Sequence, residues 1–440
     1  DLRLNWYKEQ AQTPGGLTAA QFKKDPDQSQ RSFDVFESKR ISADLNFRRP
    51  LLEGWNLNNL IYFNWFERNW FIANAPDPQA TSNQQFLREF VVVGIEPRLE
   101  RGPFVAGFRA HYETQNDVRR RGTSPGAKTG KTDREADLST TALAGYAKAD
   151  LLVLPKLTIT PGVRFEYFEQ ERNIGLRGNI GGLSGSKTTN ELVGGVGARY
   201  ELTSTIDLFA NYSRGFKPPS FSEAVDPTTG TTNDVDSELS DTYEVGARAR
   251  FTDWLRVDVT GFWINFKDQI ISEAGRLRNA GKTRHQGLET AVYLGPWGGF
   301  SANAAATFLD AEFRGGPTSG NDLPMAPEIT ASWAFRYEQP TKIGKASAQL
   351  DGIFVDDQFS DAANTVPESA DGKVGELPSY DVWNLRLGLD AIKLPLGSLK
   401  LFVGVNNLFD REYRVRRQNF FDGIFPGATR TFYGGFAFKF

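Results

Sequence analysis

The sequence predicts an all-β fold, an antiparallel transmembrane β-barrel with long extracellular loops, short periplasmic turns and about 18 strands of a probable ~22. Three observations support this prediction. Apolar and polar residues alternate along many segments, and most of these segments reach roughly ten residues. The connections between the segments are alternately short and long. No long helical stripe of apolar residues accompanies them.

The alternation is clear in the segment that begins at Leu157. Leu157, Ile159 and Val163 fall on one face of an extended chain, whereas Thr158 and Arg164 fall on the other. Because successive side chains of a strand point to opposite faces, such a segment has one apolar and one polar face. The segments with this pattern are 2–8, 39–49, 55–68, 88–100, 104–114, 140–153, 157–170, 191–202, 206–213, 241–252, 254–268, 282–295, 298–310, 328–338, 345–357, 379–391, 399–407 and 429–440.

The lengths of these segments favour strands that cross a membrane. Strands of soluble proteins have about 5–6 residues, whereas a tilted transmembrane strand needs about 9–11. Strands can cross lipid only in a closed barrel, because every backbone N–H and C=O must be satisfied within the protein. Aromatic residues near the segment ends are expected in the interfacial girdles. These residues are Trp65, Trp70, Trp254, Trp297 and Phe440.

The connections differ in length according to their order along the chain. Every second connection is short, as at 101–103, 154–156 and 203–205. An outer-membrane barrel shows this alternation because its short turns face the periplasm and its long loops face the exterior. The expected long, polar loops are 9–38, 69–87, 115–139, 171–190, 214–240, 269–281, 311–327, 358–378 and 408–428.

The composition excludes several classes of function. Lys and Arg number 51 and Asp and Glu number 54, which gives a net charge of −3, so no basic surface for nucleic acid is expected. The chain has no Cys and two His, which removes thiol nucleophiles and zinc clusters and gives an enzyme little support. We therefore expect no catalytic residues, no metal site and no resident cofactor. No run of apolar residues reaches the ~18 of a membrane helix.

The size of the barrel has two interpretations. A complete barrel of about 18 strands is porin-sized with a water-filled lumen, whereas one of about 22 strands has a plugged lumen. The abrupt first segment and the long loops favour the larger barrel. On this interpretation residues 1–440 are the C-terminal part of the barrel, and a plug domain and the first strands are absent. A β-solenoid or propeller is disfavoured because the sequence has no fixed repeat period.

Motifs near the C-terminus and in the middle of the chain add a family resemblance. Residues 405–413 (Val-Asn-Asn-Leu-Phe-Asp-Arg-Glu-Tyr) precede the stretch 426–433 and the final aromatic Phe440. Together with the stretch 212–219, these motifs resemble TonB-dependent outer-membrane receptors. Within that family the chain is most similar to the ferric citrate receptors. The segments that carry this similarity are 14–18, 94–98, 281–285, 287–290, 363–366 and 368–372.

The resemblance implies a receptor in the outer membrane of a Gram-negative bacterium. It implies import of an iron(III) chelate, ferric citrate or a similar siderophore, which binds at the extracellular loops and passes through the barrel. The TonB energy-coupling complex would drive this passage through the plug. Outer-membrane lipid and lipopolysaccharide are further expected partners, and nucleic acid is not. A passive, porin-like diffusion channel is the alternative function.

The resemblance also implies a set of ligand-binding residues, which are matched through their flanking residues. They are Arg68, Arg88, Arg119, Gln269 and Asn419. In ungapped register the asparagine of the family falls on Phe420, so Asn419 is the candidate only if the register shifts by one. Arginine suits this role because its planar fork pairs with carboxylate oxygens in a bidentate manner. The basic run from Arg119 to Arg121 is expected to attract anionic chelates or lipopolysaccharide phosphates.

Overall fold

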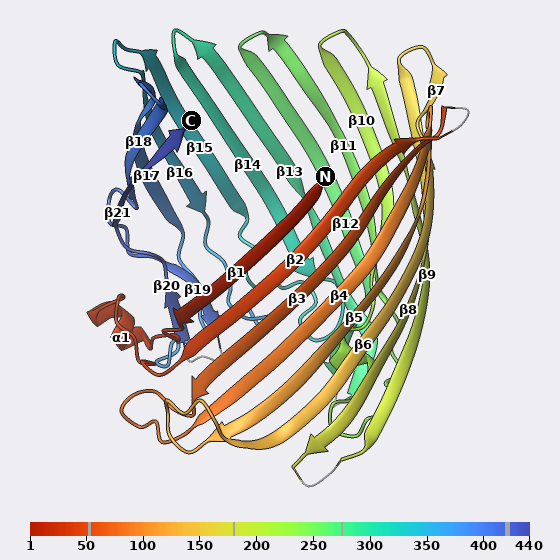
Figure 1. Cartoon of the computed structure of the whole chain (residues 1–440), viewed down its shortest axis with the longest axis vertical. Coiled ribbons are helices and arrows are strands. Elements are labelled where there is room, and N and C mark those ends of the chain that lie inside the picture. The colour runs from red at the N-terminus through yellow and green to blue at the C-terminus, as the bar shows by residue number, and fades with distance from the viewer. Residues whose placement is uncertain (52–53, 179–180, 274–275, 419–422) are drawn as a thin grey trace.

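The chain folds into one large, curved antiparallel sheet. The computed structural model describes residues 1–51, 54–178, 181–273, 276–418 and 423–440. Within these ranges the sheet contains 19 strands, and a separate two-stranded hairpin lies outside it. Figure 1 shows the strands running obliquely between two ends of the molecule, with short turns at the top and long connections at the bottom.

The described part of the chain contains two short helices and many long strands. The helices are α1 (Ala19–Lys24) and α2 (Phe221–Ala224). The strands are β1 (Leu2–Gln12), β2 (Val35–Pro50), β3 (Asn56–Ala73), β4 (Asn83–Arg101), β5 (Phe104–Gly122), β6 (Lys131–Ala149), β7 (Leu151–Leu154), β8 (Leu157–Arg177), β9 (Leu183–Glu201), β10 (Ile206–Lys217), β11 (Glu238–Thr252), β12 (Leu255–Glu273), β13 (Arg276–Trp297), β14 (Phe300–Phe313), β15 (Ile329–Pro340), β16 (Lys345–Val355), β17 (Tyr380–Leu394), β18 (Gly397–Asn406), β19 (Arg414–Gln418), β20 (Gly423–Pro426) and β21 (Thr431–Lys439). No helix in the described ranges has the length and apolar character needed to cross a membrane.

Each strand of the sheet pairs with the next one along the chain. Pairing runs from β1–β2 to β17–β18 and ends with β18–β21, after the separate β19–β20 hairpin. The consecutive strands β6 and β7 both pair with β8 and are two parts of one crossing strand. The 19 strands therefore make 18 crossings, which confirms the predicted number. In the described ranges β1 and β21 are the two edges, and no pairing joins them.

The alternation of short and long connections is confirmed, but several segments predicted as loops are wrong, because they are largely strand. The segments 69–87, 115–139, 171–190 and 269–281 are largely strand. The β5–β6 ladder, for example, continues to the pair Arg121 and Lys131. The outer ends of β5 and β6 carry mostly polar residues on both faces, so the period-two pattern disappears there. The backbone hydrogen bonds that define an antiparallel ladder do not require an apolar face, and the hairpins therefore extend beyond the patterned region.

The two faces of the sheet differ in chemistry. The outward face exposes apolar side chains such as Ile61 and Phe63. The opposite face carries polar groups, including Tyr62, whose hydroxyl lies 2.8 Å from Nδ1 of His111. An apolar exterior and a polar interior are typical of a membrane barrel. The face that Tyr62 shares is therefore the inward face.

The predicted aromatic girdle is partly wrong. Trp297 and Phe440 at the turn end are 80% and 96% exposed, as an interfacial position requires. Trp70 shares the inward face with Tyr62 in an uninterrupted register. Its indole packs edge-on against Phe36 and donates a 3.4 Å hydrogen bond to Thr13. Trp70 thus anchors a loop and does not face lipid.

Candidate functional site

Three long connections pack together at the loop end of the sheet, namely 13–34, 356–379 and 407–430. Leu17 and Ile424 exchange two backbone hydrogen bonds of 2.8 Å. Their side chains form a buried apolar cluster with Phe22 of α1. Thr18 and Gln21 make a reciprocal capping box at the start of this helix. The loops of β1–β2 and β18–β21 therefore touch, although in the described ranges the edge strands β1 and β21 do not pair with each other.

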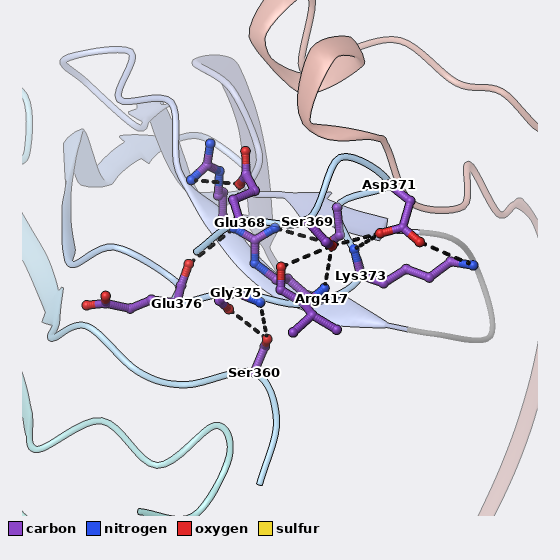
Figure 2. A network of polar contacts seen from close by, with 11 residues as sticks. Ser360, Glu368, Ser369, Asp371, Lys373, Gly375, Glu376 and Arg417 are labelled. Carbon is purple, nitrogen blue, oxygen red and sulfur yellow. Dashed lines mark hydrogen bonds and ion pairs between the residues drawn. The ribbon is translucent and has the colours of Figure 1, made fainter. Parts of the chain in front are cut away.

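Arg417 of β19 fastens the connection 356–379 to the β19–β20 hairpin (Figure 2). Its guanidinium donates to the carbonyls of Gly372 and Glu376, each at 3.1 Å, and pairs with Glu368 at 2.5 Å. Ser360 ties the same connection to itself through Gly375. The side chain of Arg417 is fully buried. This arginine therefore serves the architecture of the loops and is not presented to a ligand.

A second group of arginines lies on the inward face of β3 to β8. Arg68 of β3 is the direct cross-strand partner of Arg88 of β4, and Arg88 in turn is the partner of Asp117 of β5. Nε of Arg88 donates to Oδ1 of Asp117 at 3.2 Å, and Arg134 of β6 approaches Oδ2 of the same carboxylate at 3.6 Å. One carboxylate thus serves two guanidinium groups. Arg172 of β8 completes the group, whose charges act on one another.

We call Arg68, Arg88, Arg134 and Arg172, together with Asp117, the arginine cluster. Like charges placed directly opposite each other across strands are destabilising. The cluster nevertheless contains the opposed pair Arg68 and Arg88. Among the described residues, Nε of Arg68 and both Nε and Nη1 of Arg172 are buried without a hydrogen-bond partner. The cluster therefore has an excess of positive charge and unused N–H donors, as a binding site for an anion requires.

The structure brings together only some of the residues predicted from the sequence. Arg68 and Arg88 are adjacent. Arg119 lies on the same wall, but its guanidinium is held by Asp133 at 2.9 Å, which also binds Arg121 at 2.6 Å. Nε of Arg119 therefore already has a carboxylate partner, whereas Nε of Arg68 has none among the described residues.

Gln269 lies apart from the cluster. A bulge at Asp268, whose φ is 57°, interrupts the register between β12 and β13. Gln269 pairs with Gly281 and so returns to the inward face that Phe266 occupies. It stands at the loop end but several strands beyond the cluster. Asn419 lies outside the described residues.

Asp117, Arg134 and Arg172 were missed by the sequence prediction. All three lie in segments that were expected to be loops, so no face was assigned to them. The missing signal is the strand register, which decides which charges stand opposite one another. No group of three or more His, Asp or Glu residues in the described ranges is arranged to hold a metal ion.

Comparisons with known proteins identify the family. The sequence model described as "TonB dependent receptor-like, beta-barrel" matches residues 1–408. The chain belongs to this family. TonB-dependent receptors are β-barrel proteins of the Gram-negative outer membrane, so the predicted fold class and location are confirmed. The family consists of transport receptors, which agrees with the prediction that the protein is not an enzyme and argues against the porin-like alternative.

This receptor chain is similar to several solved structures. The unliganded ferric citrate transporter FecA has 29% identity and a TM-score of 0.84, over 98% of this chain and 66% of that chain. The ferric yersiniabactin receptor FyuA from Yersinia pestis has 18% identity and a TM-score of 0.75, over 98% of this chain and 66% of that chain. The likeness to FyuA shows the fold alone.

Curated relatives match a shorter part of the receptor. The pesticin receptor of Yersinia pestis is 25% identical over 282 residues, which is 62% of this chain and 40% of the relative. The ferrichrome outer membrane transporter/phage receptor of Escherichia coli K12 is 24% identical over 293 residues, 65% of this chain and 36% of the relative. The chain thus spans about two fifths of the length of these relatives.

Proposed function

We propose that this chain forms the wall of a receptor that imports an anionic iron(III) chelate, ferric citrate or a similar carboxylate siderophore. The opposed pair Arg68 and Arg88 on the inward face carries the proposal. Two adjacent guanidinium forks match the carboxylate oxygens that such a chelate presents. The 29% identity to the ferric citrate transporter FecA supports the same ligand class.

The receptor binds and releases its ligand and makes or breaks no covalent bond. Iron arrives already coordinated by its chelator, and the arginines recognise the organic shell. The TonB energy-coupling complex is the proposed energy source, in keeping with the description of the family. Arg68 and Arg88 stand near the loop end of β3 and β4, where a ligand from outside arrives first.

Outer-membrane lipid and lipopolysaccharide are the proposed partners of the outward face. Exposed apolar side chains such as Phe108 and Val245 suit contact with lipid tails. Near the loop end of the same face, Arg214 and Lys267 share the single carboxylate of Asp241, at 3.0 Å each. The surplus positive charge there supports contact with lipopolysaccharide phosphates.

Calorimetric titration of the protein in detergent tests the proposed ligand. Ferric citrate is the probe, and a neutral hydroxamate chelate of iron is the control. We expect ferric citrate to bind more tightly, with an affinity that falls as salt rises, because charge pairing is screened. Equal or weaker binding of ferric citrate and other carboxylate chelates, compared with the neutral chelate, would overturn the proposal.

Uptake of radioactive iron by a host that lacks its own ferric citrate receptor tests the mode of transport. With the protein in the outer membrane, we expect uptake that disappears when TonB is deleted. Uptake that persists without TonB would identify a passive channel instead.

A further inference from the structure

We propose that residues 123–130, which we call the outer strap, hold in place the strand ends that carry the arginine cluster. Gln85 is the positioning residue that anchors this strap. The inference rests on the proposed function and adds a residue that acts on the site without touching the ligand. The outer strap connects β5, which ends at Gly122, to β6, which begins at Lys131. It folds back over neighbouring strands on the outside of the barrel.

Two buried amide side chains of β4 bind the outer strap. Gln85 is fully buried, and Asn83 is 2% exposed. Nε2 of Gln85 donates to the carbonyl oxygens of Ala127 at 3.0 Å and Thr129 at 2.9 Å. Nδ2 of Asn83 donates to the carbonyl oxygens of Pro125 at 3.0 Å and Ala127 at 2.7 Å. A buried amide needs such acceptors, so both side chains favour the position in which the strap lies against β4.

The anchors place the outer strap on the outward face of the sheet. Gln85 is the direct cross-strand partner of Phe71, which lies an even number of residues from the outward-facing Ile61 in the same uninterrupted ladder. Phe71 is buried, and Nζ of Lys128 in the strap lies 3.7 Å from the centroid of its ring. The same Nζ pairs with Glu37 of β2 at 2.8 Å. The strap thus ties the outer ends of β2, β3 and β4 to the β5–β6 hairpin.

Two glycines allow the strap to lie so close to the strands. A Cβ at Gly122 would lie 2.3 Å from Oδ1 of Asn83 and 2.6 Å from Cβ of Ala127. A Cβ at Gly130 would lie 2.2 Å from the carbonyl oxygen of Arg121. Both ends of the strap therefore need a residue without a side chain, because the chain turns back against its own hairpin and against β4.

The inward face of the same strand ends carries like charges. Arg68 faces Arg88 directly across β3 and β4. Arg134 of β6 approaches Asp117, the carboxylate that Arg88 already uses. Repulsion between these guanidinium groups favours separation of the strand ends. The outer strap binds the same strands from the other side, so it opposes this separation without occupying the lumen.

Gln85 acts on the arginine cluster through the backbone. It lies three residues before Arg88 on β4, and its side chain points to the opposite face. The tie to the strap therefore fixes the strand that carries Arg88, while the lumen side of that strand stays free for a ligand. A site that is already ordered binds more tightly, because less conformational freedom is lost on binding.

The test compares Gln85→Leu with Asn116→Leu in the full chain in detergent. Leucine is similar in size to glutamine but removes both donations to the strap. Asn116 is the matched control, because its amide also lies on the outward face but donates to Asp137 of β6, at 2.9 Å. We expect Gln85→Leu to bind ferric citrate about 3–10-fold more weakly, and Asn116→Leu to bind it as the wild type does.

The outcomes distinguish this inference from the proposed function. Unchanged ferric citrate affinity in Gln85→Leu, with a wild type that binds the chelate, would overturn the inference and leave the proposed function intact. Failure of the wild type to bind ferric citrate would overturn both. Gly122→Ala displaces the strap by a different route and should weaken binding in the same way.

Hydrogen exchange and cross-linking separate positioning from a purely structural role. In Gln85→Leu we expect faster exchange of amides at the outer ends of β3 to β6 at low salt, and slower exchange at high salt, because salt screens repulsion between the arginines. The chain has no cysteine, so Glu37→Cys and Lys128→Cys in the Gln85→Leu background can be joined by a short bifunctional maleimide. This cross-link replaces the lost anchor and should restore the affinity. Exchange that does not respond to salt, or an affinity that cross-linking leaves unchanged, would show that the strap serves the fold alone.

Discussion

Arg68 stands directly opposite Arg88 across β3 and β4, with both side chains on the inward face. A strand register that aligns like charges costs stability unless an anion lies between them. Asp117 supplies one such anion to Arg88, at 3.2 Å, but Nε of Arg68 has no partner among the described residues. The pair is therefore only partly satisfied by the protein itself, which is the arrangement expected of a site that awaits a ligand.

Replacement of either arginine should weaken chelate binding. Arg68→Ala and Arg88→Ala each remove a charge-assisted hydrogen-bond donor, which contributes about 1.5–3 kcal/mol to binding. We expect a larger loss of net binding energy from Arg68, because Arg88 is already engaged by Asp117. Titration calorimetry with ferric citrate measures the effect. Arg48→Ala at the turn end is the control, and equal affinities in all the proteins would remove both residues from the site.

Asp117→Asn should change stability and affinity in opposite directions. The substitution deprives Arg88 and Arg134 of their shared carboxylate, so we expect the ligand-free protein to lose about 1–3 kcal/mol of unfolding free energy. The same change raises the positive charge of the cluster, and ferric citrate should bind more tightly, most clearly at low salt.

Thermal unfolding and calorimetry of the same samples measure the two effects of Asp117→Asn. Asp258→Asn removes a carboxylate paired with Arg256 at the turn end and should leave the affinity unchanged. Weaker ferric citrate binding in Asp117→Asn would indicate that this carboxylate positions the arginines and does not compete with the ligand.

Leu17→Ala should loosen the packed loops without unfolding the sheet. Leu17 is 1% exposed, and its partner Ile424 is fully buried. Loss of a buried leucine side chain typically costs about 2–5 kcal/mol, here confined to the contact between two loops. Hydrogen exchange of the connections 13–34 and 407–430 should accelerate. Val366→Ala, at an exposed site in the neighbouring connection, is the control, and unchanged exchange in Leu17→Ala would show that the contact is not stabilising.

The strands were predictable from the sequence, whereas Asp117, Arg134 and Arg172 of the arginine cluster were not. The alternation around Leu157 or Val163 identifies a strand because lipid and lumen impose different chemistry on its two faces. Arg134 and Arg172 lie where both faces are polar, so nothing in the local pattern distinguishes strand from loop. Their proximity to Arg88 depends on the register of four strands, which long-range pairing decides. Arg68 and Arg88 were predicted only through the family resemblance, which carries information about register that composition lacks.

Glycines beneath inward-facing aromatic rings leave the space that these rings need to pack against the barrel wall. Gly94 of β4 lies under Tyr62 of β3, and a Cβ there would come within 2.2 Å of the phenol oxygen. That hydroxyl contacts His111 Nδ1 at 2.8 Å and accepts a 3.4 Å hydrogen bond from Arg109. An added methyl group must displace the ring and break these contacts, because the ladder fixes the backbone on both sides.

Gly94→Ala should therefore destabilise the barrel by about 1–3 kcal/mol, the usual cost of overpacking. The matched control is Gly145→Ala on β6, where an added Cβ meets nothing within 4 Å and the strand gains a residue with less backbone entropy to lose. The temperature at which each protein unfolds in detergent is the measurement, with Tyr62→Leu as a second variant that removes the hydroxyl but leaves Gly94 in place. If Gly94→Ala and Gly145→Ala unfold at the same temperature, the Tyr62 ring can move without loss of stability. Its packing over Gly94 then does not stabilise the barrel.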